Sequence, residues 1–137
     1  MSESNLDVVR RGYEAFGRGD IDGLMAELDE QIQWVTPGPA ELATSGRRSG
    51  HQQVGEFFNA LNETFDIQRF EPREFITHGD RVIVLGSETT GVRATGKVIE
   101  LDWVHVFTVR NGKVVAFQDF FDTAAVVAAM TAASAAA

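Results

Sequence analysis

Apolar residues recur at helical spacing along the N-terminal part of the chain. In the first segment, spacings of three and four place these side chains on one helix face: Leu6, Val9, Tyr13 and Phe16. The sequence GRGD ends this helix, and Asp20 can cap a shorter second one. That second helix holds Ile21, Leu24, Met25 and Leu28. A third helix, roughly residues 51–61, is predicted from the stripe Val54, Phe57, Phe58 and Leu61.

The pattern elsewhere is that of strands. A short alternating stretch, QIQWV, precedes a Gly- and Pro-rich loop, and extended segments follow at residues 65–76, 82–90, 97–109 and 113–122. Asp122 or Thr123 can cap the Ala-rich residues 124–137, which we expect to form a C-terminal helix or a frayed tail. Helices followed by an antiparallel meander predict one α+β domain over residues 1–137, with the helices packed against a strongly curved, mostly antiparallel sheet.

The stretch FQDFFDT places a carboxylate among phenylalanines, and the preceding RNG turn decides which way it points. A two-residue loop pairs Val109 with Val114 and puts Asp119 on the other face of the sheet. A three-residue loop pairs Val109 with Lys113 and sets Trp103 opposite Asp119. We favour the second register, because it collects the apolar side chains on one face. That face would hold Leu101, Trp103, His105, Phe107, Val115, Phe117, Asp119 and Phe121.

An apolar wall with one His and one Asp is typical of a small-molecule pocket. Asp119 is therefore the main catalytic candidate. His105 on the same face could share acid and base roles, for proton transfer next to a carbonyl or for activation of water. In the alternative interpretation both residues are satisfied core residues, with Asp119 bonded to the backbone or to the Trp103 N–H. Trp34 and Trp103 are as consistent with core packing as with ligand stacking.

The amino-acid composition limits the kinds of partner that the protein is expected to bind. Twelve basic against twenty acidic residues give a net charge of −8, which argues against a nucleic-acid or anionic-membrane surface. There is no cysteine, and the three histidines lie far apart, so neither a metal site nor a cofactor is predicted. The polar start MSESNLDVVRR lacks the apolar run of a signal peptide, and no stretch is long enough to span a membrane. These features predict a cytoplasmic protein.

Three stretches carry a family resemblance: VVRRGYEAFGRGDIDGLMAELDEQIQW, RRSGHQQVGEFF and DWVHVFTVRNGKVVAFQDFFDT. In order and spacing they resemble the SnoaL-like branch of the nuclear-transport-factor-2-like superfamily. The resemblance covers nearly the whole chain. It implies a conical α+β barrel with a deep cavity for an apolar small-molecule ligand, and commonly a homodimer through the outer sheet face. The family includes polyketide cyclases, ketosteroid isomerases, limonene-epoxide hydrolases and dehydratases, together with members of no known activity.

Two enzyme patterns of this family can be compared with the chain. Against the epoxide hydrolases, Asp119 matches the aspartate that activates water, and Glu88 matches the acid that donates a proton. Gly86 stands where that family has an arginine between the two carboxylates. Trp34 and Thr36 stand where it has the tyrosine and the asparagine that hold the water.

Against the ketosteroid isomerases, the general base falls on Thr36 and the protonated aspartate on His105, while Tyr13 lies one residue from the oxyanion tyrosine. The resemblance thus implies an isomerase, cyclase, lyase or epoxide-hydrolase-like enzyme with Asp119 as base and His105 and Glu88 as partners. The alternative is a non-catalytic ligand-binding or dimerisation module of the same fold. The predicted ligand contacts are Trp34, Thr36, Trp103, Tyr13, Phe16 and Phe121.

Overall fold

The computed structural model describes residues 4–131, which form four helices and one six-stranded sheet. The helices are α1 (Asn5–Gly17), α2 (Ile21–Met25), α3 (Gly50–Thr64) and α4 (Thr123–Met130). The strands are β1 (Leu28–Thr36), β2 (Gly46–Ser49), β3 (Phe65–His78), β4 (Arg81–Val92), β5 (Val98–Arg110) and β6 (Lys113–Phe121). The predicted α+β class is confirmed.

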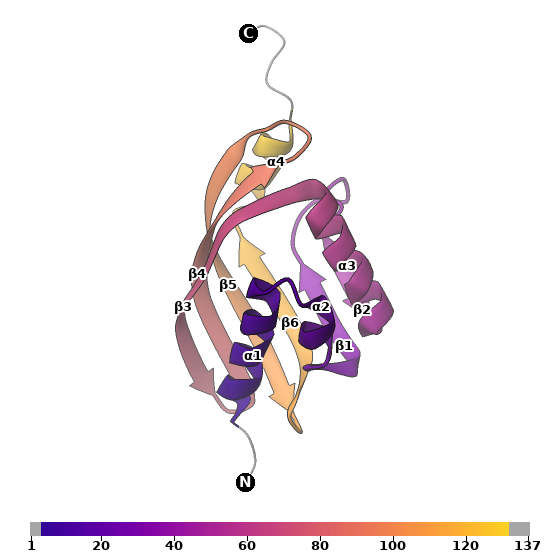
Figure 1. The fold of residues 1–137 in the computed structure, drawn as a ribbon, viewed down its shortest axis with the longest axis vertical. Helices are drawn as coiled ribbons and strands as arrows, with labels where there is room; N and C mark the ends of the chain where they lie inside the picture. The colour runs from indigo at the N-terminus through magenta and orange to yellow at the C-terminus, as the bar shows by residue number, and fades with distance from the viewer. Residues whose placement is uncertain (1–3, 132–137) are drawn as a thin grey trace, which may run out of the picture.

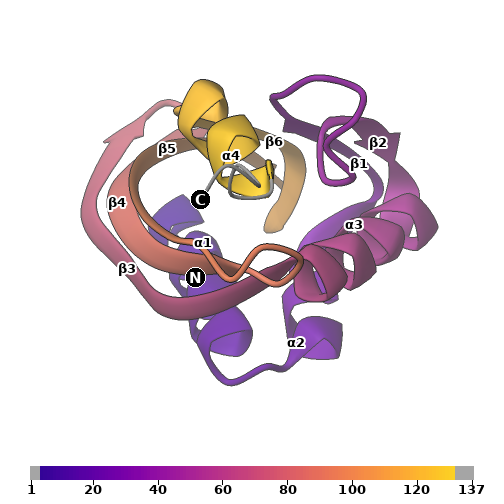
Figure 2. The ribbon, with the colours of Figure 1, turned by 90° about the horizontal axis from the view of Figure 1, so that it is seen from above.

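The sheet has the strand order β2-β1-β6-β5-β4-β3 and is antiparallel except for the pairing of β1 with β6. It curls strongly but stays open between its edge strands, β2 and β3 (Figures 1 and 2). Helices α1, α2 and α3 lie on its concave side, and α4 lies across one end (Figure 2). The parallel β1–β6 contact brings the N-terminal third of the chain beside the last strand.

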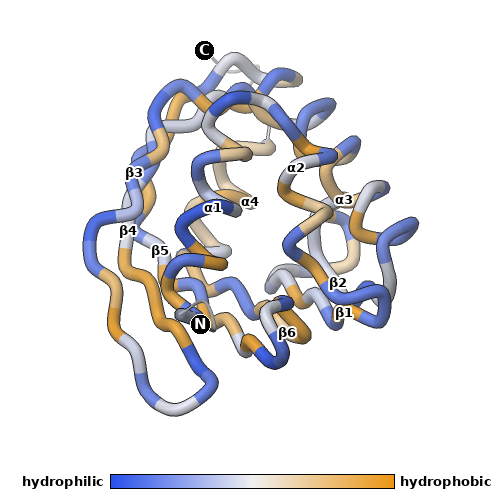
Figure 3. Tube along the Cα trace, turned by 60° about the horizontal axis from the view of Figure 1, so that its bottom comes forward, coloured by the Kyte–Doolittle hydropathy of each residue, from blue (hydrophilic) through white to orange (hydrophobic). Residues whose placement is uncertain are grey.

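The helix ends follow the expected capping chemistry. Ser4 accepts a hydrogen bond from the backbone of Asp7 at the start of α1, and Asp20 caps α2 as predicted. Asp122 caps α4 through the Ala125 N–H, so the aspartate rather than Thr123 is the cap. The alternation of polar and apolar residues along α1 marks its buried face (Figure 3). Of the predicted C-terminal segment 124–137, residues 132–137 lie outside the described chain.

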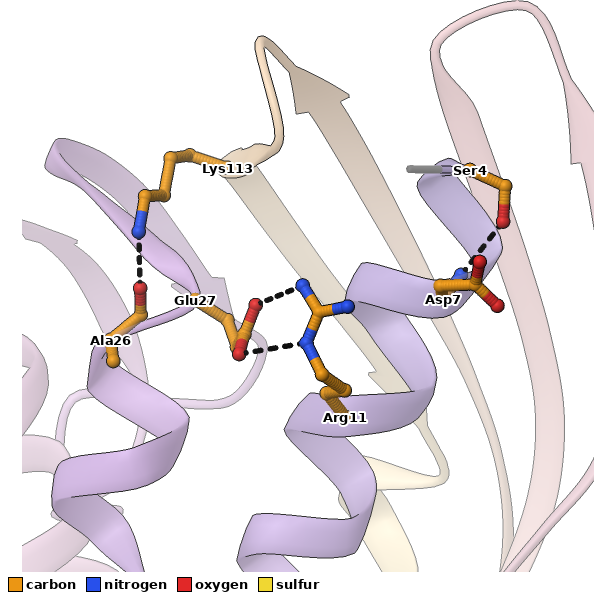
Figure 4. Close-up of polar contacts among 6 residues, drawn as sticks. All are labelled: Ser4, Asp7, Arg11, Ala26, Glu27 and Lys113. Carbon is orange, nitrogen blue, oxygen red and sulfur yellow. Dashed lines mark hydrogen bonds and ion pairs between the residues drawn. The ribbon is translucent and has the colours of Figure 1, made fainter. Parts of the chain in front are cut away.

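Three hydrogen bonds join α1, the segment after α2 and the sheet at the end opposite α4 (Figure 4). The Arg11 guanidinium donates through Nε and Nη2 to the two carboxylate oxygens of Glu27, at 3.1 and 2.8 Å. Lys113, at the β5–β6 turn, donates through Nζ to the Ala26 carbonyl at 2.6 Å. This end of the molecule is therefore held by α1, by the segment that follows α2, and by the hairpin together.

Two sequence-based boundaries differ in the structure. The short helix α2 ends at Met25, and Leu28 opens β1 instead of closing the helix. The segment predicted as a loop contains β2, which pairs with β1 from Gln33 to Thr36. Arg47 and Arg48 lie in this added edge strand, which its composition of Gly, Arg and Ser did not indicate.

The favoured hairpin register is wrong. Asn111 and Gly112 both have positive φ, 52° and 75°, which makes a two-residue type I′ turn. The turn pairs Arg110 with Lys113 and Val109 with Val114, but Thr108 then pairs with Ala116. Val115 is therefore the extra residue of a β-bulge.

Because of the bulge, most of the side chains predicted for the inner face lie on that face, although the strand pairing differs from the predicted one. The bulge shifts the pairing by one residue, so His105 stands opposite Asp119, and Trp103 stands opposite Phe121. The predicted pairing of Trp103 with Asp119 is thus incorrect. Val114 takes the buried place expected for Val115. The inner face nevertheless carries the predicted aromatic residues, the histidine and the aspartate.

Candidate functional site

A cavity with about 760 Å³ of empty space, its open mouth included, lies between the helices and the inner sheet face. Its walls come from α1, α2, α3 and five of the strands. Most of the lining is apolar, and the polar side chains in it are Tyr13, Glu27, Glu88, His105 and Asp119. Among the predicted ligand contacts, Tyr13, Phe16 and Trp34 line this cavity. An apolar space with a few convergent polar groups suits a small organic ligand.

Three of the polar side chains form a connected row across α1, β5 and β6. The Tyr13 hydroxyl lies 2.8 Å from His105 Nδ1, and His105 Nε2 lies 3.2 Å from Asp119 Oδ1. The imidazole is buried, and it stacks on the Trp103 indole with ring centres 3.9 Å apart. His105 is thus held between a phenol, an indole and a carboxylate.

The row has a preferred proton arrangement. An ionised carboxylate only accepts, so the His105 nitrogen facing Asp119 must carry a hydrogen. In the neutral imidazole Nδ1 is then the acceptor, and the Tyr13 O–H donates to it. Burial, and after it the charge of Asp119, raises the pKa of Tyr13 well above 10.0. The phenol therefore stays neutral and keeps the proton that fixes the tautomer.

Asp119 is incompletely satisfied. Among residues 4–131 its buried Oδ1 has no hydrogen bond of good geometry, since the nearby His105 Nε2 is close but poorly aligned. A buried carboxylate oxygen without such a partner is costly in a purely structural role. This oxygen belongs to a residue that lines the cavity, where a substrate proton could meet it.

Glu88 on β4 supplies the second carboxyl group of the cavity. It accepts a hydrogen bond from the Thr90 hydroxyl. Burial raises the pKa of Glu88 above its ordinary value of 4.5, and the charge of Asp119 raises it further, against the lowering effects of Thr90 and Arg69. A carboxyl group with a raised pKa keeps its proton to a higher pH than an ordinary glutamate does, which suits a group that donates a proton.

Gly86, where the resemblance to the epoxide hydrolases implies an arginine, packs against Trp103. They pair across β4 and β5. A Cβ on Gly86 would collide with the six-membered ring of Trp103 and would lie 2.6 Å from the Glu71 carbonyl oxygen. The indole therefore occupies the space that any side chain at position 86 would need. This indole also stacks on the His105 imidazole.

The remaining predicted contacts lie elsewhere. Thr36 and Phe121 line a smaller adjoining cavity, which Glu88 and Asp119 also line. Trp103 lines neither of these two cavities, and its ligand contact stays a prediction. The Tyr13–His105 contact and the Gly86–Trp103 packing were not predicted. The spacing of Tyr13 on its helix face placed it toward the sheet, but only the fold brings it to His105.

No group of His, Cys, Asp and Glu within residues 4–131 has an arrangement that could hold a metal ion. In the same part of the chain, no helix has the length and apolar character needed to cross a membrane.

Comparison with known proteins agrees with this architecture. The sequence profile of SnoaL-like domains matches residues 9–117. An NTF2-like protein of unknown function from Burkholderia pseudomallei is 34% identical, over 96% of this chain and 100% of that one, with a TM-score of 0.88. An NTF2-like protein from Burkholderia xenovorans is 35% identical, over 93% and 95% of the two chains, with a TM-score of 0.84.

A third relative was crystallised with a small molecule. TerC, co-crystallised with polyporic acid, is 32% identical, over 92% of this chain and 97% of that one, with a TM-score of 0.84. No curated protein matches the sequence. The profile match and the identity to three solved structures lead to one conclusion: the chain belongs to the SnoaL-like domain family, with the NTF2-like fold.

Proposed function

We propose that this protein is an acid–base enzyme that moves protons on an apolar carbonyl compound, as an isomerase, cyclase or lyase does. One observation carries the proposal. The unsatisfied Asp119 Oδ1 belongs to the same apolar cavity as Glu88, whose pKa is raised. Both are carboxyl groups, and the raised pKa of Glu88 suits it for the role of the acid.

In the proposed reaction Asp119 Oδ1 takes a proton from the carbon next to the carbonyl group. The electrons of that C–H bond form a carbon–carbon double bond, and Glu88 gives its proton to the carbonyl oxygen, which leaves an enol. If the substrate has a second double bond between the β and γ carbons, this intermediate is a dienol. Return of the Asp119 proton to the γ carbon, with the enol proton going back to Glu88, moves the double bond into conjugation with the carbonyl group and completes an isomerisation. If Glu88 instead protonates a hydroxyl group on the next carbon, water leaves and the product is an unsaturated carbonyl compound.

His105 and Tyr13 act in this scheme as positioning residues. The Nε2 of His105 lies 3.2 Å from Asp119 Oδ1, so the imidazole packs directly against the proposed base. Tyr13 fixes the tautomer that carries a hydrogen on this nitrogen. Neither residue needs to exchange a proton with the substrate.

The relatives support the choice of ligand. TerC was crystallised with polyporic acid, and it is 32% identical to this chain. The aromatic lining of the cavity suits a ligand that contains rings. Polyporic acid is therefore the first compound to test for binding.

One observation favours the alternative, a non-catalytic ligand-binding module. The Trp103 ring fills the space at Gly86, the position where the resemblance to the epoxide hydrolases implies an arginine, so the chain lacks the full catalytic set which that resemblance would imply. A module of this kind would bind apolar ligands and leave their C–H bonds untouched.

Hydrogen–deuterium exchange separates the two proposals without knowledge of the natural substrate. Enones, polyketide lactones and hydroxyketones are incubated in D₂O with the protein, and deuterium uptake next to the carbonyl is followed by NMR. We expect catalysed exchange by the wild type and a loss of at least about a hundredfold in Asp119→Asn. Asp102→Asn, which removes an exposed carboxylate from β5, is the matched control and should keep the rate. If the protein binds compounds of the panel but catalyses deuterium exchange in none of them, the result would favour the non-catalytic ligand-binding module.

The homodimer expected from the family also stays a proposal. Analytical ultracentrifugation over a range of protein concentrations tests it directly.

A further inference from the structure

The acid–base pair lies where two cavities meet. The smaller one has about 450 Å³ of empty space, open solvent at its mouth included, and shares five lining residues with the larger: Phe57, Leu61, Ile67, Glu88 and Asp119. It lies toward α4, whose Val126 is part of its wall. A single substrate could therefore extend from one cavity into the other, past both carboxyl groups.

The two cavities differ in polarity. The larger one is lined by rings, including those of Tyr13, Phe16 and Trp34. The smaller one has three buried threonines in its wall: Thr36, Thr44 and Thr90. Its described lining contains no Lys, Arg or His, and its only ionisable groups are Glu88 and Asp119. A carboxylate or phosphate substituent would face two acids there and find no cation.

Thr36 is the threonine with an unused hydrogen-bonding group. Its side chain is 4% exposed, and among residues 4–131 its hydroxyl has no hydrogen-bond partner. The parallel pairing of Val35 with Gln118 brings Thr36 alongside Asp119 on the inner face. The hydroxyl of Thr90, by contrast, is bonded to Glu88. A buried hydroxyl without a partner normally costs stability, so its retention beside the base points to a ligand group that satisfies it.

Thr44 is held in place from outside the cavity. The Arg48 guanidinium donates through Nη1 to the Thr44 carbonyl oxygen at 3.0 Å, and its carbon Cζ lies 5.3 Å from the centre of the Phe57 ring. The loop that carries Thr44 is thus fixed to β2 and α3, and the wall of the smaller cavity is built from anchored elements on this side.

We infer that the substrate has two unlike arms. Its ring system occupies the larger cavity, and a short chain ending in an uncharged carbonyl or hydroxyl oxygen enters the smaller cavity and bonds to Thr36. The reacting carbon then lies at the junction, beside Asp119 and Glu88. The inference rests on the proposed function for the role of the carboxyl pair, but the two-armed shape rests on the cavities and on Thr36 alone.

Three simple aromatic probes test the shape by binding. Benzylacetone has a phenyl ring and a four-carbon chain with a ketone, n-butylbenzene has the same chain without oxygen, and toluene has the ring alone. Dissociation constants come from amide NMR titrations of the whole protein. We expect wild type to bind benzylacetone more tightly than the other two. Thr36→Val should weaken benzylacetone about three- to tenfold, the usual value of a neutral hydrogen bond, and leave the two hydrocarbons unchanged.

Filling the smaller cavity tests its place in the binding site. In Val126→Phe, benzylacetone and n-butylbenzene should bind no more tightly than toluene does. The affinity for toluene should stay as it is in the wild type. Thr44→Leu fills the same space from the loop and replaces Val126→Phe if that variant does not fold.

The inference is overturned if benzylacetone binds the wild type no better than toluene does. It is also overturned if Thr36→Val changes the three affinities in parallel, or if long chains bind the filled variants as tightly as the wild type. Because these titrations need no turnover, the two-armed site and the acid–base chemistry can fail independently. Loss of deuterium exchange in Asp119→Asn with unaltered probe binding would support both.

Discussion

His105 stands opposite Asp119 in the β5–β6 pairing, and its Nε2 lies 3.2 Å from Asp119 Oδ1. A base that takes a proton from carbon needs a restricted position, and the imidazole packed beside this carboxylate limits the space in which it can rotate. His105→Gln should therefore lower the kcat for deuterium exchange by about tenfold to a hundredfold with little change in KM. Steady-state kinetics measure the effects on kcat and on KM separately. A rise in KM alone would mean that His105 serves as a ligand contact instead.

Tyr13 controls the same histidine from its other side. In Tyr13→Phe the ring packing against Phe70 and Phe75 can persist, but the hydroxyl that lies 2.8 Å from His105 Nδ1 is gone. We expect a smaller share of the Nε2–H tautomer and a loss of activity no greater than in His105→Gln. Nitrogen NMR of the imidazole reports the tautomer. An unchanged tautomer in this variant would contradict the proton arrangement derived for the row.

Glu88 should make stability depend on pH in a defined direction. Since burial raises its pKa above 4.5, the folded protein keeps this proton at pH values where the unfolded chain has lost it. The stability due to this group is fully present below about pH 4.5 and is lost as the pH rises through the raised pKa. The side chain at position 88 cannot ionise in the variant Glu88→Gln. The free energy of unfolding of this variant, relative to that of the wild type, should therefore increase as the pH rises over this range.

Urea unfolding at a series of pH values measures this difference. A difference that stays constant with pH, or that shrinks as the pH rises, would show that Glu88 is not buried as described. The same variant should also lose the alkaline limb of the activity profile, because a protonated Glu88 is the proposed acid.

The Gly86–Trp103 packing should be sensitive to a single methyl group. Gly86→Ala places a Cβ into the Trp103 ring and near the Glu71 carbonyl, and we expect it to lower the free energy of unfolding by about 1–3 kcal/mol. Gly12→Ala is the matched control. Gly12 lies in α1, and a methyl group there would meet nothing within 4 Å, so alanine should stabilise by about 0.5–1 kcal/mol.

Equilibrium denaturation of both variants gives the comparison. If Gly86→Ala proves neutral, the indole has room to move, and the space at position 86 is open to other side chains. The double variant Gly86→Ala with Trp103→Phe provides a further check. If the clash is real, the smaller ring should restore part of the free energy of unfolding that Gly86→Ala loses, and if it is not, the restored part should be smaller.

The sequence predicted the elements well because apolar spacing is a local property. The stripes of α1 and α3 and the alternation of β5 and β6 reflect which side chains are buried, and the structure buries them. The strand β2 was missed because four residues of Gly, Arg and Ser carry no such pattern. Its pairing with β1 comes from its place in the fold, not from its own composition.

The register was missed for a different reason. Both turns considered assume a regular ladder on either side, whereas the chain combines the two-residue turn with a bulge at Val115. Several valines in a row, as at positions 114 and 115, give no sign of which one is extra. Asp119 and His105 were placed on the inner face because the burial of the aromatic residues requires it. Their direct contact, the position of Tyr13 and the ring over Gly86 depend on distances across elements that a sequence does not carry.

The central place of β6 has a consequence for the order in which this protein can be made. As the chain leaves the ribosome, β1 is complete long before the strand that pairs with its inner edge, and β5 waits for the same strand. Neither edge is covered until residues 113–121 have emerged, and the β1–β6 pairing, whose strands are distant in sequence, forms slowly. Asp119 lies in that strand. The nascent chain therefore exposes the unpaired edges of β1 and β5 until the strand that carries the candidate base has been synthesised.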